Sequence, residues 1–185
     1  GFKTIIGYSF MNSILFSMLG CDYVASGWFN TLRKFQKSRF DLTNSFGKRK
    51  KRYTSIPLLS NIMLDDMYGM LECDKLTIND LLSATQIDSY IENEDLESVS
   101  FVDLEHQYWE SLSILFDEFS QVEGVANRIE VMKEKIKDAN NLYRIAIDYL
   151  EGEDKVAATR LKNSSKHLST WLSAIEIFKS IAAIV

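Results

Sequence analysis

Few residues in this sequence have the types and spacing of a catalytic or metal-binding set. Asp103, His106 and Glu110 are separated by three and four positions, so their side chains would share one face of a helix. One imidazole and two carboxylates make a partial metal site, but ordinary pairing on a helix surface gives the same spacing. The sequence contains no HExxH, GxSxG, P-loop, GxGxxG or paired Cys/His motif. It predicts no metal and no cofactor, identifies no catalytic residue, and favours a non-enzymatic role.

The most distinctive chemistry is a concentration of positive charge between residues 33 and 52. This basic segment has a single acid, Asp41, and ends in five consecutive cations. Phe35, Phe40, Phe46 and Tyr53 are interleaved with the charges, and aromatic rings stack on unpaired bases while cations bind phosphates. The candidate polyanion-binding residues are Arg33, Lys34, Lys37, Arg39, Lys48, Arg49, Lys50, Lys51 and Arg52.

Three interpretations of the five-cation run stay open at this point. It binds a phosphate backbone, it folds against acidic residues of its own chain, or it is a solvated loop without a fixed partner.

Residues 76–127 contain twelve acids and no Lys or Arg. The net charge of −5 is therefore the sum of a strongly basic segment and a strongly acidic one. A second cationic group, free of acids between residues 155 and 175, consists of Lys155, Arg160, Lys162 and Lys166 beside His167. The phosphate interpretation gains weight if both groups lie on one face.

The composition is that of a globular protein without a disulfide framework. Cys21 and Cys73 form no paired motif, which is typical of reduced thiols and predicts a cytoplasmic location. An uncharged run from Thr4 to Cys21 contains several polar residues and is at the short limit for a membrane span, so we expect a buried element and no membrane. Expected partners are nucleic acid or an acidic protein surface.

Apolar spacing predicts three long helices after residue 100. Apolar residues recur every three or four positions through 101–122, 125–150 and 157–185, interrupted near Gly124 and Gly152. Ser100 and Asp103 stand at the positions of an N-cap and the third helical residue. Such regular alternation is typical of an antiparallel bundle, and the same seams permit pairing between chains as a homo-oligomer.

The middle of the chain is predicted to contain two further helices. The first covers "SIPLLSNIMLDDMYGMLE", with Ser55 near its cap and Pro57 in its first turn. The second covers "LTINDLLSATQIDSYI", where Thr77 and Asp80 occupy capping-box positions.

The first forty residues are compatible with two folds. "TIIGYS" and "CDYVASG" read as short buried strands joined by a helix over "FMNSILFSML", or residues 9–20 and 28–40 are two helices of an all-α domain. "LGCDYVASGWFNTLRKF" resembles the last β/α unit of phosphate-binding (β/α)8 barrels. The resemblance implies phosphate contacts from backbone N–H groups near Ser26, Gly27 and Trp28.

The predicted fold class is mainly α, with a C-terminal antiparallel bundle of three long helices. A smaller N-terminal helical subdomain is compatible with a short βα element. The expected regions are an N-terminal subdomain with the basic loop (1–75), an acidic helical connector (76–99) and the three-helix bundle (100–185). The predicted function is that of a helical interaction or scaffold module whose basic loop contacts nucleic acid or another polyanion. The alternative is the C-terminal portion of a (β/α)8-barrel-type enzyme acting on a phosphorylated or nucleic-acid substrate.

Overall fold

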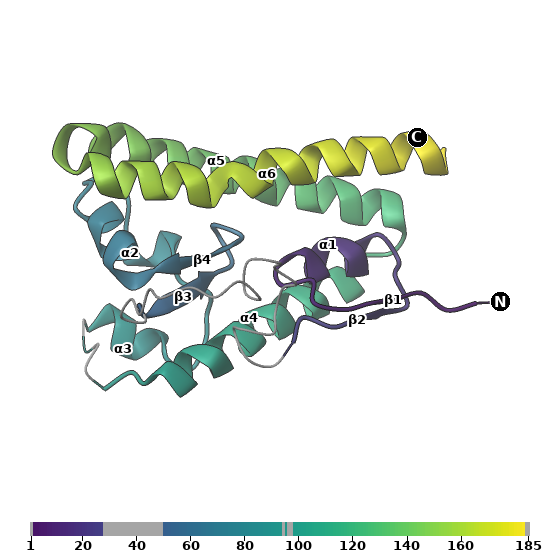
Figure 1. Ribbon diagram of the computed structural model, residues 1–185, viewed down its shortest axis with the longest axis horizontal. Helices are drawn as coiled ribbons and strands as arrows, with labels where there is room; N and C mark the ends of the chain where they lie inside the picture. Colours follow the sequence, from purple (N-terminus) through teal and green to yellow (C-terminus); the bar gives the residue numbers. More distant parts are fainter. Residues whose placement is uncertain (1, 28–49, 94, 96–97, 184–185) are drawn as a thin grey trace, which may run out of the picture.

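The computed structural model describes residues 2–27, 50–93, 95 and 98–183, and these residues are mainly helical (Figure 1). The N-terminal part contains β1 (Ile5–Ile6), α1 (Asn12–Met18) and β2 (Tyr23–Val24). The central part contains β3 (Arg52–Ser55), β4 (Ser60–Met63), α2 (Leu64–Leu71), a 3₁₀ turn (Ile78–Asp80) and α3 (Asp88–Glu92). The C-terminal part contains α4 (Phe101–Ser120), α5 (Val125–Glu153) and α6 (Lys155–Ala182). The predicted fold class, mainly α with three long C-terminal helices, is confirmed.

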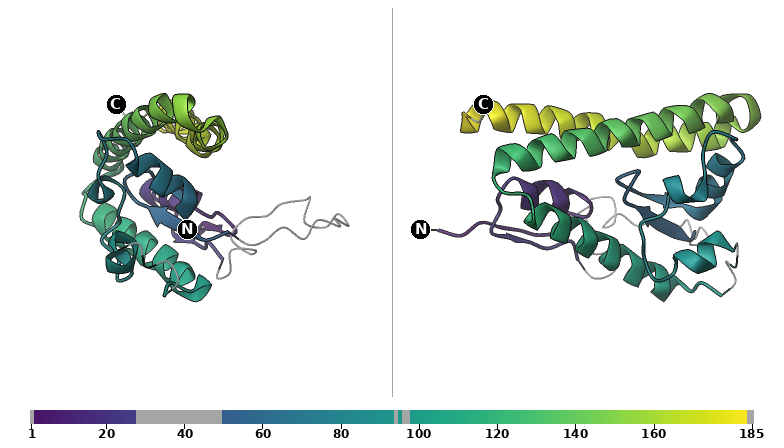
Figure 2. Two further views of the ribbon diagram at one scale, coloured as in Figure 1. Left: turned by 90° about the vertical axis from the view of Figure 1, so that its left-hand side faces the viewer. Right: turned by 180° about the vertical axis from the view of Figure 1, so that it is seen from behind.

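Helices α5 and α6 form an antiparallel hairpin along one side of the molecule (Figures 1 and 2). Seven of the eight positions that the spacing placed on the α5 seam are buried, and the eighth, Val125, is half-buried. The chain turns into α5 at Gly124, whose φ of +80° lies where a side chain would be strained. Asp154 then caps α6 by accepting hydrogen bonds from Val156 N (2.9 Å) and Ala157 N (3.0 Å). The α5–α6 hairpin therefore follows from the apolar spacing and the Asp154 cap, whereas Gly124 forms the connection from α4. Gly152, near which the sequence predicted a break, is still part of α5.

Helix α4 meets α5 at the Gly124 connection and then diverges from the hairpin (Figure 2). Its start is a complete capping box, in which Asp103 N donates to the Ser100 hydroxyl (3.1 Å) and Ser100 N donates to the Asp103 carboxylate (2.8 Å). Near the connection, Lys135 of α5 pairs with Glu118 of α4 at 2.8 Å. The elements of residues 2–27 and 50–93 fill the space between α4 and the hairpin, so one continuous core unites all three regions.

The N-terminal element is a β–α–β unit. Strands β1 and β2 are parallel, with Ile5 opposite Tyr23 and Ile6 opposite Val24, and α1 provides the crossover that parallel strands require. Ile14, Leu15 and Met18 of α1 are buried, whereas Ile5 and Tyr23 are 73% and 50% exposed. The β–α–β order of the first residues is therefore confirmed, but the expectation that its strands are buried is wrong. The expected helix over 28–40 lies outside the described residues.

The predicted helix over residues 55–72 is wrong in its first half. Strands β3 and β4 form an antiparallel hairpin, with Tyr53 opposite Ile62, and only Leu64–Leu71 is helical. Ser55 does not cap a helix, because its hydroxyl donates to the Leu81 carbonyl (2.7 Å) and accepts from Leu58 N (3.2 Å). Contacts from distant parts of the chain thus override the local helical signal.

The predicted helix over residues 76–91 is also too long. The Thr77–Asp80 capping box is present, but it starts a single 3₁₀ turn, and α3 begins only at Asp88. Between them, Ser83 accepts a hydrogen bond from Ile56 N and donates one to the Thr54 carbonyl, both at 2.8 Å. Hydroxyl side chains that bind backbone groups elsewhere compete with helix formation, and here they join the segment to β3.

Candidate polyanion-binding face

The structure describes the last three residues of the basic segment, Lys50, Lys51 and Arg52. Lys50 and Arg52 are exposed and Lys51 is half-buried. The Arg52 guanidinium donates to the Asn61 carbonyl across the β3–β4 hairpin at 3.0 Å. The other candidates, Arg33, Lys34, Lys37, Arg39, Lys48 and Arg49, lie outside the described residues.

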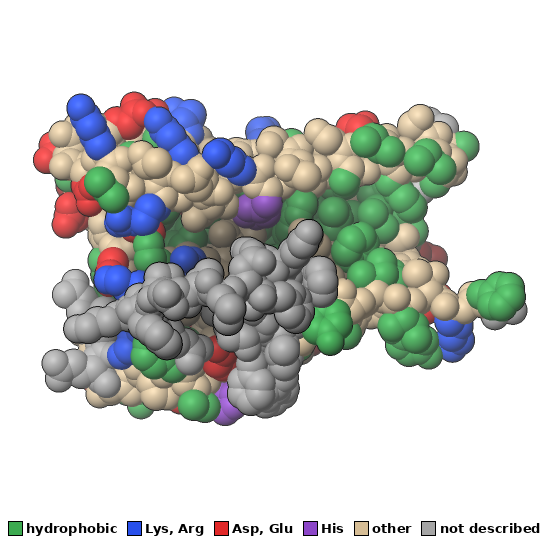
Figure 3. All heavy atoms as spheres, viewed as in Figure 1, with side chains coloured by type: hydrophobic (Ala, Val, Ile, Leu, Met, Phe, Trp, Pro, Cys, Tyr) green, Lys and Arg blue, Asp and Glu red, His purple; other side chains and the backbone are tan. Residues whose placement is uncertain are grey.

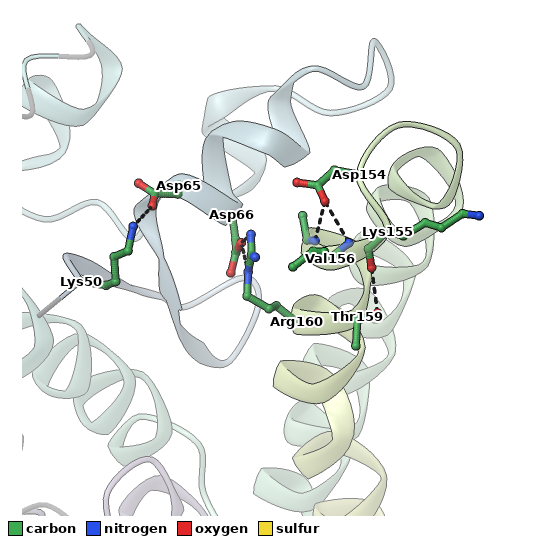
Figure 4. A network of polar contacts seen from close by, with 9 residues as sticks. Lys50, Asp65, Asp66, Asp154, Lys155, Val156, Thr159 and Arg160 are labelled. Atoms are coloured by element: carbon green, nitrogen blue, oxygen red, sulfur yellow. Dashed lines mark hydrogen bonds and ion pairs between the residues drawn. The ribbon is translucent and has the colours of Figure 1, made fainter. Parts of the chain in front are cut away.

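Two neighbouring aspartates of α2 hold one cation from each basic group (Figure 4). Lys50 Nζ lies 3.0 Å from Asp65 Oδ2, and both side chains are more than 60% exposed. On the other side, Arg160 Nε and Nη2 lie 2.7 and 2.6 Å from Asp66 Oδ1. The end of the basic segment and the cationic half of α6 therefore meet at the first turn of α2.

The two ion pairs differ in environment and therefore in role. Asp66 is buried, with a side chain only 3% exposed, and a buried carboxylate is costly without a partner. The hydrogen bond to Asp66 raises the pKa of the Arg160 guanidinium, so this pair joins α6 to α2. The Lys50–Asp65 pair is exposed and contributes little to stability, which leaves Lys50 able to exchange its partner.

The other cations between residues 155 and 166 are exposed on α6. Lys155 and Lys166 are exposed, and Lys166 Nζ contacts the neutral Asn163 amide at 2.7 Å. Lys162 pairs with Glu151 of α5 and thereby holds the Glu151 pKa below its usual value. Glu151, Lys155, Ala158, Thr159 and Lys162 line a surface depression at this end of the hairpin.

Basic side chains gather on one face of the molecule. In Figure 3 they follow the half of α6 nearest the α5–α6 turn and reappear on the same side over the central elements. Asp and Glu side chains, in red, lie among the Lys and Arg side chains at that end of the molecule. We call the set of exposed cations Lys50, Arg52, Lys155, Lys162 and Lys166 the basic face.

The phosphate-binding candidates of the β/α resemblance lie directly after β2. Ser26 is buried, 3% exposed, and its hydroxyl hydrogen-bonds the Tyr108 hydroxyl of α4. The Tyr108 ring stacks on Phe10 with centroids 5.6 Å apart. Gly27 has a φ of +83°, and Trp28 lies outside the described residues. Ser26 therefore anchors the residues just after β2 to α4.

The sequence did not predict the buried polar network around β3. Gln107 of α4 is fully buried; its amide donates to the Thr54 carbonyl (2.8 Å) and accepts from Thr54 N (2.9 Å). It pairs with β3 in the way that a neighbouring strand would. One feature of the sequence could have indicated this network: Gln107 and Ser111 are two polar residues four positions apart on the buried face of α4.

A second part of this network surrounds the Tyr53 hydroxyl. That hydroxyl donates to Asp88 Oδ1 (2.7 Å) and accepts from Ser83 N (2.8 Å), while Thr85 N donates to Asp88 Oδ2 (3.0 Å). Burial raises the pKa of Tyr53 above its usual value, which keeps the phenol protonated. Because each described donor in this set has a protein acceptor, the network is suited to fixing the hairpin rather than to catalysis.

Two members of the Asp103–His106–Glu110 set, Asp103 and Glu110, accept hydrogen bonds from backbone N–H groups. Asp103 belongs to the α4 capping box, and the Ser100 hydroxyl lowers the Asp103 pKa. Glu110 accepts hydrogen bonds from Gln86 N at 3.1 and 3.2 Å. Within the described residues no three His, Cys, Asp or Glu side chains are grouped as metal ligands.

Comparisons with known proteins identify no relative. The sequence matches no protein family, and neither the curated proteins nor the solved structures contain a significant match. Among the helices in the described part of the chain, none is both long and apolar enough to cross a lipid bilayer.

Proposed function

We propose that this chain is a helical interaction module that binds a nucleic acid or a similar polyanion on its basic face. The observation that carries the proposal is the convergence of Lys50 and Arg160 on Asp65 and Asp66, which joins two cationic groups far apart in sequence. Arg52 and Lys166 make their contacts with neutral oxygens, so their charges are available to phosphates.

The rigid part of the module is the core that holds these cations. Helix α6 is fixed by the apolar seam with α5 and by the Asp66–Arg160 pair. Strand β3 is fixed by Gln107 and by the Tyr53 network. Cations on rigid elements lose less conformational freedom on binding than cations on a free loop.

Binding of labelled single-stranded RNA at several salt concentrations, followed by fluorescence anisotropy, tests the proposal. The variant K155Q/K166Q removes two charges from the basic face, and K137Q/R144Q removes two exposed charges from α5 as a matched control. Because each phosphate contact contributes about 0.7 to the slope of log K against log salt for single strands, we expect K155Q/K166Q to lower the slope by about 1.4. The control should leave the slope unchanged; equal losses in both variants would place the attraction outside the basic face.

A second candidate function is favoured by the β1–α1–β2 unit. Parallel strands with a helical crossover are the repeating unit of (β/α)8 barrels, and parallel sheets are normally covered on both faces, whereas here Ile5 and Tyr23 are largely exposed. This candidate is the C-terminal portion of a barrel-type enzyme that acts on a phosphorylated or nucleic-acid substrate, with the phosphate near Gly27.

Calorimetric titration with inorganic phosphate tests this second candidate. A Cβ at a φ of +83° would strain the backbone, so G27A should weaken phosphate binding. G152A, at the exposed end of α5, is the control and should bind as the wild type does. If the wild-type chain binds no phosphate, or G27A binds equally well, the candidate is rejected.

A further inference from the structure

Tyr143 of α5 places a hydroxyl group in the core without a hydrogen-bond partner among the described residues. The residue is only 2% exposed. A buried hydroxyl that bonds to nothing has lost its hydrogen bonds to bulk water without replacement, which lowers stability. Burial raises the pKa of Tyr143 above its ordinary value, so the phenol keeps its proton and still requires an acceptor.

Two other polar side chains belong to the surroundings of this hydroxyl. Ser60 of β4 is buried, and its hydroxyl lowers the Tyr143 pKa in part, but the two hydroxyls are not in hydrogen-bond geometry. Asp66 of α2 is also buried, and its negative charge raises the Tyr143 pKa further. Because α2 packs against β4, α5 and α6, polar groups from three elements come together in one part of the core.

The Asp66 carboxylate lacks a donor at one of its oxygens. Arg160 donates to it twice (Figure 4), but Nε and Nη2 both contact Oδ1, at 2.7 and 2.6 Å. Within the part of the chain that the structure describes, Oδ2 receives no side-chain hydrogen bond. A carboxylate accepts through both oxygens, and this side chain is only 3% exposed. One region of the core therefore holds a donor without an acceptor and an acceptor without a donor.

We propose that this region binds a buried water molecule that joins Tyr143, Asp66 and Ser60. The water accepts a hydrogen bond from the Tyr143 hydroxyl and donates one to Asp66 Oδ2. Its third partner is the Ser60 hydroxyl, which gives the water the number of contacts, about three, that is typical of buried waters in proteins. Water suits the site because it donates and accepts at once. The site is a property of the fold and does not depend on polyanion binding.

A crystal structure at a resolution that shows ordered water tests the proposal directly. We expect a water within hydrogen-bond distance of both Tyr143 Oη and Asp66 Oδ2. Tyr53 is the matched control, because it is equally buried but donates to Asp88 and accepts from Ser83 N, so its hydroxyl should contact no water. A direct bond between the Tyr143 hydroxyl and Ser60 or Asp66, with no water between them, would overturn the proposal.

Urea unfolding of the variant Y143F gives an independent test, in which the sign of the effect is decisive. If a water accepts from the hydroxyl, its removal breaks a hydrogen bond and the unfolding midpoint should fall below that of the wild type. If the hydroxyl has no partner, its removal takes an unsatisfied polar group out of the core and the midpoint should rise. Y149F is the control, since Tyr149 lies on the same helix and is half-buried; its midpoint should match the wild type. A Y143F midpoint at or above the wild-type value would contradict the proposal.

Discussion

The α5–α6 hairpin and the β3–β4 hairpin are held together by different physical means. The first has a seam of buried apolar side chains that includes Ile136, Leu161 and Ile175. The second is surrounded by buried hydroxyl, amide and carboxyl groups, among them Tyr53, Thr54 and Gln107. Apolar burial depends on volume and tolerates exchange among similar residues, whereas a buried polar network requires each partner. The comparison teaches that the two hairpins should respond differently to conservative substitutions.

The largest effect is expected from a cavity in the apolar seam. Leu161 is fully buried, so Leu161→Ala should lower the free energy of unfolding by about 3 kcal/mol, the sum of lost burial and an unfilled cavity. Leu161→Met conserves the volume and should cost less than about 1.5 kcal/mol. Urea denaturation measures the free energy of unfolding of both variants. If the methionine variant is as unstable as the alanine variant, side-chain volume does not determine the stability of the α5–α6 seam.

A somewhat smaller effect is expected when the amide that pairs with β3 is removed. Gln107→Leu leaves the buried Thr54 N–H without its acceptor and should cost about 2 kcal/mol, although leucine has a similar size and the Thr54 carbonyl keeps the Ser83 hydroxyl as a donor. The same denaturation experiment shows the contrast with Leu161→Met. If Gln107→Leu is neutral or stabilising, apolar packing can fully replace the contribution of the polar network to stability.

The Tyr53 hydroxyl tests a single point of the network. Tyr53→Phe keeps the buried ring but removes the acceptor of Ser83 N and the donor to Asp88, and we expect a loss of about 1.5 kcal/mol. Tyr90→Phe is the control, because Tyr90 is 47% exposed and its change should be close to zero. A loss at Tyr90 equal to that at Tyr53 would mean that the hydroxyl contacts are not the cause.

The smallest effect is expected at the cap of α4, which belongs to neither hairpin. Ser100→Ala removes the side chain that accepts from Asp103 N and should cost about 1 kcal/mol. The Ser100 hydroxyl, followed by the Ser100 backbone, lowers the pKa of Asp103, so this stabilisation is present above the ordinary Asp value of about 3.9 and is lost as the pH falls below it. Thermal unfolding should therefore show a larger difference in melting temperature between the wild type and Ser100→Ala at pH 7 than at pH 3.

The sequence was most informative where structure is local. The three-to-four spacing identified all three long helices, and Ser100 with Asp103 identified the start of α4. It failed between residues 55 and 91, where the hydroxyls of Ser55 and Ser83 bind backbone groups distant in sequence. These residues have helical neighbours, so a local pattern cannot reveal that their hydroxyls serve another element.

The candidate face shows the same division. The cations of residues 50–52 and 155–166 were recognised from composition, but their meeting at Asp65 and Asp66 was not. The position of His167 was also hidden, since a histidine beside lysines on a helix gives no sign that its two ring nitrogens lie 2.8 Å from the carbonyl oxygens of Ser164 and Leu59.

By itself, the sequence determined the long helices, their apolar faces and the separation of positive from negative charge, because these depend on residue type and on spacing within one turn or a few turns. Tertiary structure alone decided that residues 52–63 form a hairpin rather than a helix, that Gln107 completes the hydrogen bonds of β3, and that Lys50 and Arg160 meet neighbouring aspartates of α2. The hairpin is held by groups such as Gln107 and Leu81 that lie more than twenty positions away, and the free energy of such contacts arises only when the chain has folded.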